Sequence, residues 1–398
     1  EQDFLKVCIS DFEKAHPYVN TSRLVPKKLP ATEKLSRFLS DQLPLSSYEA
    51  APLFDAEKKP FGAICVVRQG NFSAEQLDLI SFCAWKISLI LEKTITFKKK
   101  ITFERHIRKA FSRFVPEQII DELVSEAGSA SKVAVGEKRK IAILFCDIRS
   151  FTNISECNKP EVIVAFLNRY FTIMVNVIKK HGGTIDKFMG DAIMALFGAP
   201  VSYEDNARRA VAAACEMRTA LNSVPLEDLV LPPQMQFDIG IGIHYGDVIV
   251  GSIGSSDKTD YSVIGDNVNL ASRLEGLSKT YGAMIIVSGN VKNGIQGNKD
   301  GFVFRYLDNV KVKGKAQPVP IYAVDAHLGE FTEAYRDAYA KGLDLFQQGV
   351  WNLSREYFEK ASWLAPGDKA AKLMLSRCEE FIANPPEQWD GAITFTTK

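Results

Sequence analysis

The sequence has little of several features that would place it in a special class of protein. Its 398 residues carry a formal net charge of only +1, so no overall field attracts nucleic acid. The seven cysteines are scattered without a CxxC pair, which excludes a disulfide scaffold and favours a reducing, cytoplasmic compartment. The most apolar run, Leu79 to Leu91, is too short to span a bilayer and contains Lys86. We therefore expect a soluble chain without a membrane segment.

Two aspartates stand where apolar runs end in turns. The run from Ile141 to Cys146 is typical of a strand buried on both faces, and Asp147 follows at its exit. Gly190 and Asp191 separate the runs "TIDKFM" and "AIMALF", which predicts a β-hairpin with Asp191 at its tip. If these strands are neighbours, the two carboxylates share one sheet edge, where oxygen ligands suit Mg²⁺ or Mn²⁺ bound with substrate phosphates. Either aspartate alone has an ordinary explanation as a turn residue.

A polar pair follows in the segment "GDNVNLASRLEGL". Leu270, Leu274 and Leu277 predict the buried stripe of a helix. Asn269 and Arg273, four residues apart, lie on a neighbouring stripe, so both polar groups can reach one ligand. The ordinary alternative is an exposed pair without a ligand.

Five motifs together resemble the catalytic domain of class III nucleotide cyclases. In chain order they are "FCDIRSFT", "GGTIDKFMGDAIMALFG", "GIHYGDVIVGSIG", "YSVIGDNVNLASRLE" and "VKVKGK". The resemblance implies an α/β (α+β) fold, with a mixed sheet covered by helices such as the amphipathic Pro160 to Lys180. It also implies an adenylate cyclase, which converts ATP to 3′,5′-cyclic AMP and pyrophosphate.

The resemblance assigns one set of residues to metals and terminal phosphates. Asp147, the Ile148 carbonyl and Asp191 would hold two divalent cations per site, Mg²⁺ or Mn²⁺. The backbone N–H groups of Phe151 and Thr152 would receive the terminal phosphates.

A second set would bind the rest of the nucleotide. By resemblance, Asn269 contacts the ribose and Arg273 stabilises charge at the α-phosphate. Lys313 matches the phosphate-binding lysine of the family. Lys187 and Ser262 occupy its two base-reading positions.

The choice of base follows from hydrogen-bond polarity. The Lys187 ammonium only donates, which suits N1 of adenine and not N1–H of guanine, so the residue favours ATP. The Ser262 hydroxyl suits either base, because it can accept from the adenine amino group or donate to the guanine carbonyl. A lysine with a small hydroxyl residue also resembles bicarbonate-stimulated cyclases, which suggests bicarbonate or another small-molecule regulator.

In the family, the metal ligands come from one protomer and the remaining site residues from the other, so the resemblance implies a head-to-tail homodimer. Three alternatives remain open. The chain is a guanylate cyclase, or a catalytically silent nucleotide-binding or scaffold module, or a nucleotidyl transferase of polymerase-palm type. The last of these is disfavoured because the chain has no basic nucleic-acid track.

We divide the chain into four parts. Residues 1–93 resemble a partial GAF sensor module, 94–133 a coiled-coil linker and hinge, 134–326 the cyclase domain, and 327–398 a tetratricopeptide-like tail. Because the first residue is Glu1 rather than methionine, we expect a fragment of a longer protein.

Two of these parts carry structural predictions of their own. Ser73 and Gln76 predict a capping box at the start of a helix, and apolar residues recur at nearly 3.5-residue spacing from Ile87 to Phe111, as in a parallel coiled coil. A single helical repeat cannot bury its own apolar face, so we expect the tail to pack on the cyclase domain.

Overall fold

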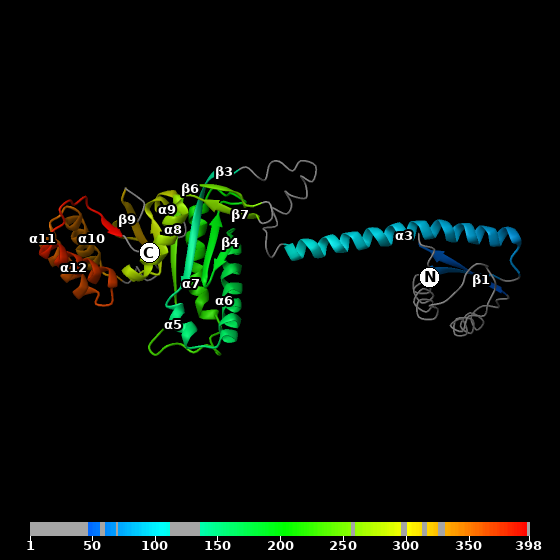
Figure 1. Cartoon of the computed structure of the whole chain (residues 1–398), viewed down its shortest axis with the longest axis horizontal. Helices are drawn as coiled ribbons and strands as arrows, with labels where there is room; N and C mark the ends of the chain where they lie inside the picture. The colour runs from blue at the N-terminus through cyan, green and yellow to red at the C-terminus, as the bar shows by residue number, and fades with distance from the viewer. Residues whose placement is uncertain are drawn as a thin grey trace. The chain divides into compact units, whose positions relative to one another are not determined.

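The computed structural model describes residues 47–55, 60–68, 71–111, 136–255, 259–295, 301–312, 317–324 and 331–395. It divides into two compact units, Glu1–Arg113 and Phe114–Lys398 (Figure 1), which we describe separately. The predicted phosphate ligand Lys313 lies outside the described residues, as do the first half of the GAF-like module and the predicted hinge. The four-part division of the chain stays a prediction.

The first unit is a β-hairpin covered by a long helix. Strands β1 (Ser47–Phe54) and β2 (Pro60–Arg68) pair antiparallel. Helix α3 (Ala74–Phe111) packs Ala84 against Ala51 and Leu53 of β1. In the same contact, the N–H of Phe54 donates to the buried Ser88 hydroxyl at 3.1 Å. These few buried groups hold the helix on the hairpin.

The start of helix α3 is the predicted capping box. The N–H of Ser73 donates to Oε1 of Gln76 at 3.0 Å, and the N–H of Gln76 donates back to the Ser73 hydroxyl at 3.4 Å. Further along, Ile90 and Phe97 on the predicted coiled-coil stripe are each 64% exposed. An exposed apolar stripe on a 38-residue helix favours pairing with another helix.

The second unit is built on a nine-stranded mixed sheet with the strand order β11-β9-β10-β8-β6-β3-β5-β4, to which β7 adds by pairing with β6 (Figure 1). The pairs β6–β8 and β9–β11 are parallel and the others antiparallel. This mixed sheet confirms the predicted α/β class. The strands are β3 (Glu137–Ile148), β4 (Thr184–Met189), β5 (Ala192–Phe197), β6 (Ile239–Gly254), β7 (Thr259–Ile264), β8 (Ile285–Ser288), β9 (Phe304–Val312), β10 (Val319–Val324) and β11 (Ile393–Phe395).

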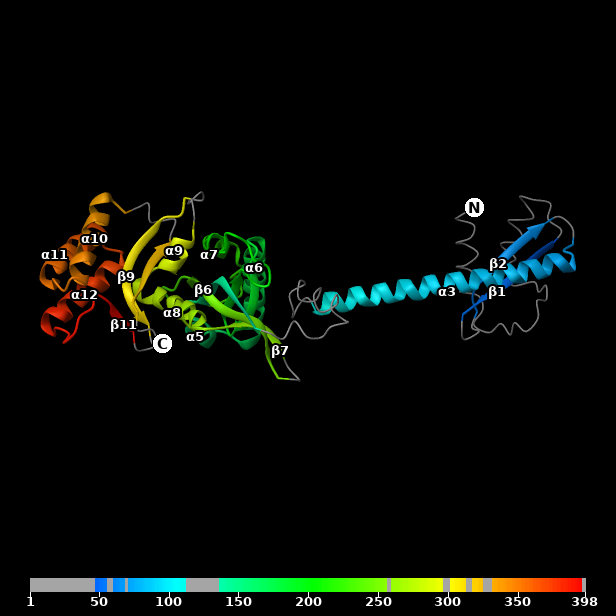
Figure 2. The ribbon, with the colours of Figure 1, turned by 90° about the horizontal axis from the view of Figure 1, so that it is seen from above.

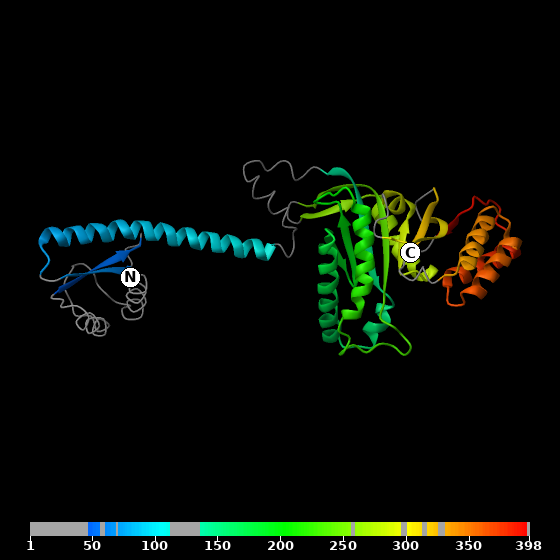
Figure 3. The same ribbon diagram turned by 180° about the vertical axis from the view of Figure 1, so that it is seen from behind.

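Helices cover both faces of the sheet (Figure 3). On central strand β3, Leu144 and Cys146 face the core shared with α6 and α7, whereas Ile143 and Phe145 face the core shared with α8. The strand is therefore buried on both sides, as its apolar run predicted. The helices of this part are α5 (Phe151–Glu156), α6 (Pro160–Lys180), α7 (Asn206–Ala220), a short 3₁₀ helix (Leu221–Ser223), α8 (Asp266–Tyr281) and α9 (Gly289–Gly294).

Helix α6 is the one helix among the described residues that is long and apolar enough to cross a membrane. Its predicted apolar stripe is nevertheless in the core, where Phe166, Tyr170 and Met174 are fully buried between α6 and the sheet. A core helix passes the same test of length and composition. Its position in the fold is therefore that of a sheet-covering helix.

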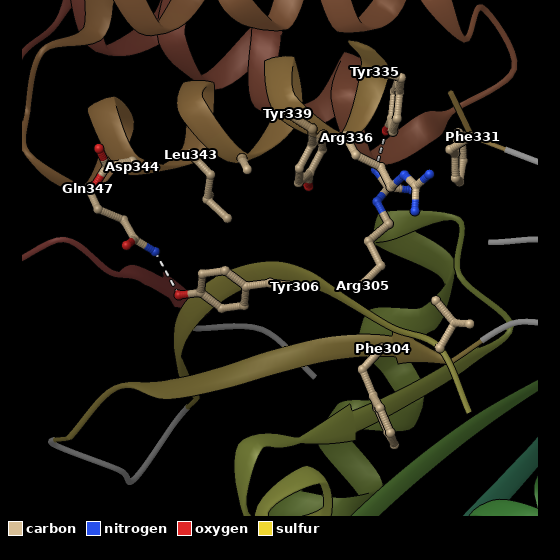
Figure 4. Close-up of a pocket in the computed structure, with 12 residues that line it drawn as sticks. Phe304, Arg305, Tyr306, Phe331, Tyr335, Arg336, Tyr339, Leu343, Asp344 and Gln347 are labelled. Atoms are coloured by element: carbon tan, nitrogen blue, oxygen red, sulfur yellow. Dashed lines mark hydrogen bonds between the residues drawn. The ribbon is translucent and has the colours of Figure 1, made fainter. Parts of the chain in front are cut away.

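The C-terminal tail packs on the sheet, as expected for helices that cannot bury their own apolar face. Helices α10 (Glu333–Gln347), α11 (Trp351–Leu364) and α12 (Lys369–Ala383) share one core with α8, β9 and β10 (Figure 2). Strand β11 then pairs parallel to β9, with Ile393 opposite Val310. A pocket of about 430 Å³ between β9 and α10 has Tyr306 and Tyr339 among its aromatic lining residues (Figure 4).

A buried polar cluster joins the tail to the end of helix α8. Nη1 of Arg377 in α12 donates to the Asp308 carboxylate of β9 at 2.8 Å. The hydroxyl of Tyr281, the last residue of α8, donates to the same carboxylate at 2.6 Å. Burial raises the pKa of Asp308, while Arg377 and the hydrogen bonds act in the opposite direction. The tail thus holds the end of α8 through the buried Asp308 carboxylate, whose negative charge Arg377 balances.

Replacing Arg377 with methionine should destabilise the protein strongly. The change leaves Asp308, which is 0% exposed, as a buried charge without its counter-ion, at a cost of about 3–5 kcal/mol. The free energy of unfolding from urea titration measures this loss. A matched control is Arg355→Met in α11, because the Arg355–Glu359 pair is exposed and should contribute below about 1 kcal/mol. Equal losses in the two variants would contradict the assigned role of the buried pair.

Candidate functional site

The two predicted carboxylates lie at the same end of adjacent strands. Strands β3 and β5 pair antiparallel with Cys146 opposite Ile193. Asp147 comes just after Cys146 and Asp191 just before Ile193, so both lie at the same end of the strand pair. The β4–β5 connection is a tight turn at Gly190 and Asp191, and Gly190 has φ +67°. Glycine tolerates this left-handed conformation, which a hairpin tip commonly requires. The predicted sheet-edge position of both aspartates is confirmed.

The environment of this carboxylate pair favours a cation. The pKa of Asp147 is raised to about 7, mainly by burial, and further by the charge of Asp191 and a hydrogen bond between the two. Oδ2 of Asp191 is buried and has no hydrogen-bond partner among the described residues. A divalent cation would satisfy that oxygen and remove the repulsion between the carboxylates. The residues present therefore fit a metal.

Two carboxylates do not fill the coordination shell of a hard cation. Within the described ranges, no group of three or more His, Cys, Asp or Glu side chains is arranged to hold a metal ion. Mg²⁺ is commonly held by one or two carboxylates together with substrate phosphates and water. The neighbouring backbone supplies further groups at this edge, since β3 ends at Ile148 and Phe151 and Thr152 open helix α5. First-turn N–H groups have no partner within a helix and point toward an incoming ligand.

A third acid near the pair was missed by sequence reasoning. Glu275 of α8 has its pKa raised to about 7 by burial and then by the charge of Asp147, with Arg149 acting in the opposite direction. The helix comes this close because β6 has glycine where it crosses α8. A Cβ on Gly242 would lie 2.1 Å from the Glu275 backbone nitrogen. No short-range pattern marks Glu275, because the contact joins a helix and a strand distant in sequence.

The two predicted base-reading residues are in contact. Nζ of Lys187 on β4 lies 3.2 Å from the hydroxyl oxygen of Ser262 on β7. Among the described strands, β7 pairs only with β6, while β4 is at the far edge beyond β3 and β5. The β6–β7 ribbon must therefore reach over the sheet to bring Ser262 to Lys187.

A buried aspartate completes this cluster and was also missed. Asp186 accepts from the Ser262 hydroxyl at 3.0 Å and pairs with the Lys187 ammonium at 3.3 Å, both through Oδ2. Its side chain is fully buried, and Oδ1 has no hydrogen-bond partner within the described part of the chain. Burial raises the pKa of Asp186, against the opposing effects of Ser262 and Lys187.

Helix α8 presents the predicted polar pair on its outer side. Leu270, Leu274 and Leu277 are buried, while Asn269 is exposed and Arg273 half-buried. The predicted placement of the two stripes is therefore confirmed. No hydrogen bond or ion pair among the described residues joins Arg273 to the carboxylate pair or to Lys187. One chain thus holds three separate groups of site residues: the carboxylate pair, the base-reading cluster and the α8 pair.

Comparison with known proteins identifies the family that this part of the chain resembles. Residues 133–326 match the family described as the adenylate and guanylate cyclase catalytic domain. An adenylate cyclase of Anabaena cylindrica is 40% identical over 224 residues, which are 54% of this chain and 43% of that protein. The chain spans less than half the length of the first curated relatives that it matches.

Solved structures also resemble this part of the chain. The guanylyl cyclase Cya2 is 43% identical, with 48% of this chain and 93% of that one covered and a TM-score of 0.41. The adenylyl cyclase CyaB from P. aeruginosa is 34% identical, with 48% and 96% covered and a TM-score of 0.44. Residues 133–326, which hold the carboxylate pair and the Lys187–Ser262 contact, are thus the part of the chain that matches the adenylate and guanylate cyclase catalytic domain.

Proposed function

We propose that the chain is an adenylate cyclase that converts ATP to 3′,5′-cyclic AMP and pyrophosphate. The observation that carries the proposal is that one cyclase domain holds both the Asp147–Asp191 pair and the Lys187–Ser262 contact. The first suits a metal-bound triphosphate and the second suits a purine base. The curated adenylate cyclase relative from Anabaena cylindrica supports the same reaction.

The reaction joins the 3′-oxygen of ATP to its α-phosphorus as the bond from that phosphorus to the β-phosphate oxygen breaks. The 3′-hydroxyl loses its proton and pyrophosphate leaves with the bond electrons. Two bound cations would lower the pKa of the 3′-hydroxyl and neutralise the leaving pyrophosphate. Asp147, Asp191 and the Ile148 carbonyl would hold these cations, and the N–H groups of Phe151 and Thr152 would bind the terminal phosphates.

Residues of α8 and β4 would orient the rest of the nucleotide. Asn269 would bind the ribose, and the Arg273 guanidinium would stabilise the charge that develops at the α-phosphate. Lys187 would donate to N1 of adenine, which favours ATP over GTP. In the segment outside the described residues, Lys313 stays a predicted phosphate ligand.

The site requires two copies of the chain. The carboxylate pair makes no hydrogen bond or ion pair with Arg273 or Lys187 in the described structure, which supports a site completed by a second protomer. A head-to-tail homodimer would join the carboxylates of each protomer to the base-reading cluster and α8 pair of the other. A two-fold axis would relate the two protomers of such a dimer, so the dimer would hold two equivalent sites.

The N-terminal unit would set the geometry of that dimer. Its helix α3 carries the exposed residues Ile90 and Phe97, which would pair with α3 of the second protomer as a parallel coiled coil. A GAF-like sensor would act through this pairing, whereas a bicarbonate response is suggested by Lys187 and Ser262 in the cyclase domain. None of the described cysteines forms a disulfide, which supports a reducing, cytoplasmic location; they are Cys83, Cys146, Cys157, Cys215 and Cys378.

Product analysis tests the proposed reaction. Purified chain with Mn²⁺ should form cyclic AMP and pyrophosphate from ATP, with a lower kcat/KM for GTP. Chelation of the metal, or Asp191→Ala, should reduce turnover at least about a hundredfold, because both remove electrostatic stabilisation of the transferred phosphate. Preferred turnover of GTP would instead identify a guanylate cyclase. Nucleotide binding without pyrophosphate release would identify a silent binding module.

Complementation tests the shared site. Asp147→Ala and Arg273→Ala chains should each be inactive alone, but their mixture should regain about a quarter of wild-type activity, since half of the dimers are mixed and each holds one intact site. Cyclic AMP formation after the two chains are mixed measures the recovery. A second mixture serves as the control: Asp147→Ala with Asp191→Ala lacks a carboxylate in both sites and should stay inactive. Absence of recovery in the first mixture alone would contradict the shared site.

Metal binding should strengthen as the pH rises through about 7. The Asp147 carboxyl binds a proton below its raised pKa of about 7, and a cation must displace that proton. Below pH 7 the apparent Mn²⁺ affinity should therefore fall up to about tenfold per pH unit, and it should level off above pH 8. Calorimetric Mn²⁺ titrations at pH 6, 7 and 8 measure this dependence. Affinity independent of pH over this range would contradict the raised pKa.

A further inference from the structure

A buried carboxylate beside the base-reading pair has no role in the mechanism above. The side chain of Asp186 is 0% exposed to solvent, and a buried charge is costly unless it is paired and hydrogen-bonded. It lies on edge strand β4, where the register with β5 shifts between Ile185 and Lys187. Successive strand residues normally point to opposite faces, but an irregularity of this kind re-aims side chains. Asp186 and Lys187 can therefore both reach Ser262.

The contacts of Ser262 determine where its proton lies. A hydroxyl has one proton to donate and two lone pairs to accept with. The Ser262 oxygen is 3.0 Å from Oδ2 of Asp186, and an ionised carboxylate only accepts, so the hydroxyl donates to Asp186. The Lys187 ammonium, 3.2 Å away, donates to the same hydroxyl oxygen and occupies one lone pair. Only one acceptor position of Ser262 is left for a ligand.

Asp186 also directs the ammonium. Of the three N–H groups of Lys187, one points to Ser262 and one to Asp186 at 3.3 Å. The third is left to donate to a ligand. The cluster therefore offers a base one donor and one acceptor side by side. Adenine presents the complementary pattern, with an acceptor at N1 and a donor amino group at N6, whereas guanine presents N1–H and a carbonyl oxygen.

We propose that Asp186 determines the choice of nucleotide by holding the Ser262 hydroxyl as an acceptor, so that the cluster selects adenine over guanine. Asp186 is a positioning residue, because its effect on the choice of base goes through the Ser262 hydroxyl and its own side chain is buried. The proposal rests on the proposed cyclase function. Without Asp186, the hydroxyl can turn and donate to the guanine carbonyl, which removes one of the two mismatches against GTP.

The test compares two nucleotides in the wild type and in Asp186→Ala. The ratio of kcat/KM for ATP to that for GTP should fall about tenfold or more. In the wild type, the fixed Ser262 hydroxyl cannot pair with the guanine carbonyl, whereas in the variant it can turn and donate to it. Equal losses with both nucleotides would show a merely structural role and overturn the proposal. Asp186→Leu, which also removes the acceptor but keeps more of the side-chain volume, should give the same fall and replaces the alanine variant if that variant does not fold.

Two further variants identify the route of the effect. Asp260→Ala removes an exposed carboxylate of β7 that lies two residues from Ser262, on the same face of the strand, and whose charge acts on Asp186; if the Ser262 hydroxyl is the route, this change should leave the ratio unchanged. In a Ser262→Ala background, Asp186→Ala should cause no additional fall, since the hydroxyl through which it acts is absent. An additional fall of the same size would show that Asp186 acts without Ser262 and would overturn the proposal.

Binding separates this proposal from the proposed activity. Dissociation constants for non-hydrolysable ATP and GTP analogues should show the same change in ratio in Asp186→Ala. If wild-type protein forms no cyclic nucleotide but its binding ratio falls in the variant, the cyclase activity is refuted and the role of Asp186 stands. If turnover is normal and neither ratio changes, the role of Asp186 is refuted and the activity stands.

Discussion

The close contact between helix α8 and strand β6 is the constraint on which the site depends. At Gly242 a single added carbon would meet the backbone of Glu275 and Ala271, so the helix lies against the strand with no side chain between them. This contact sets the depth of α8 over the sheet. It thereby sets the position of Asn269 and Arg273 on the outer side of the same helix. The glycines of β6 thus determine where these two side chains lie, through the placement of a helix.

The same contact explains the electrostatics of the sheet edge. With α8 close, Glu275 adds its charge to the field of Asp147 and Asp191, and burial weakens the screening by water. Arg149 carries the opposite charge and acts against this field at Glu275, although burial lowers the pKa of its own guanidinium. The folded chain therefore has a region of negative electrostatic potential at this edge of the sheet in the absence of a ligand. A triphosphate alone would be repelled there, whereas a triphosphate with its cations brings the positive charge that the edge lacks.

The sequence predicts those parts of the site that depend on short-range patterns. Asp147 and Asp191 were found because apolar runs and a glycine-containing turn mark the ends of strands, and strand pairing then brings them to one edge. The contact of Lys187 with Ser262 came from the resemblance to cyclases, since the two residues are 75 positions apart. Asp186 was missed because a local shift in strand register, which no residue type announces, turns its side chain into the cluster. The Arg377–Asp308 pair, 69 positions apart, depends on how the tail docks.

The last strand of the tail has a consequence for the order of folding. Strand β11 closes the β9 edge of the catalytic sheet, with Phe395 opposite Val312, about 80 residues after β9 has been synthesised. Until that point a newly made chain presents β9 as an open edge, with backbone groups free to pair with another chain. The sheet is thus completed only after helices α10 to α12 have been synthesised, and without β11 this edge of β9 would be left unpaired. The tail therefore supplies both a packing surface and the last strand for the sheet of the domain that precedes it.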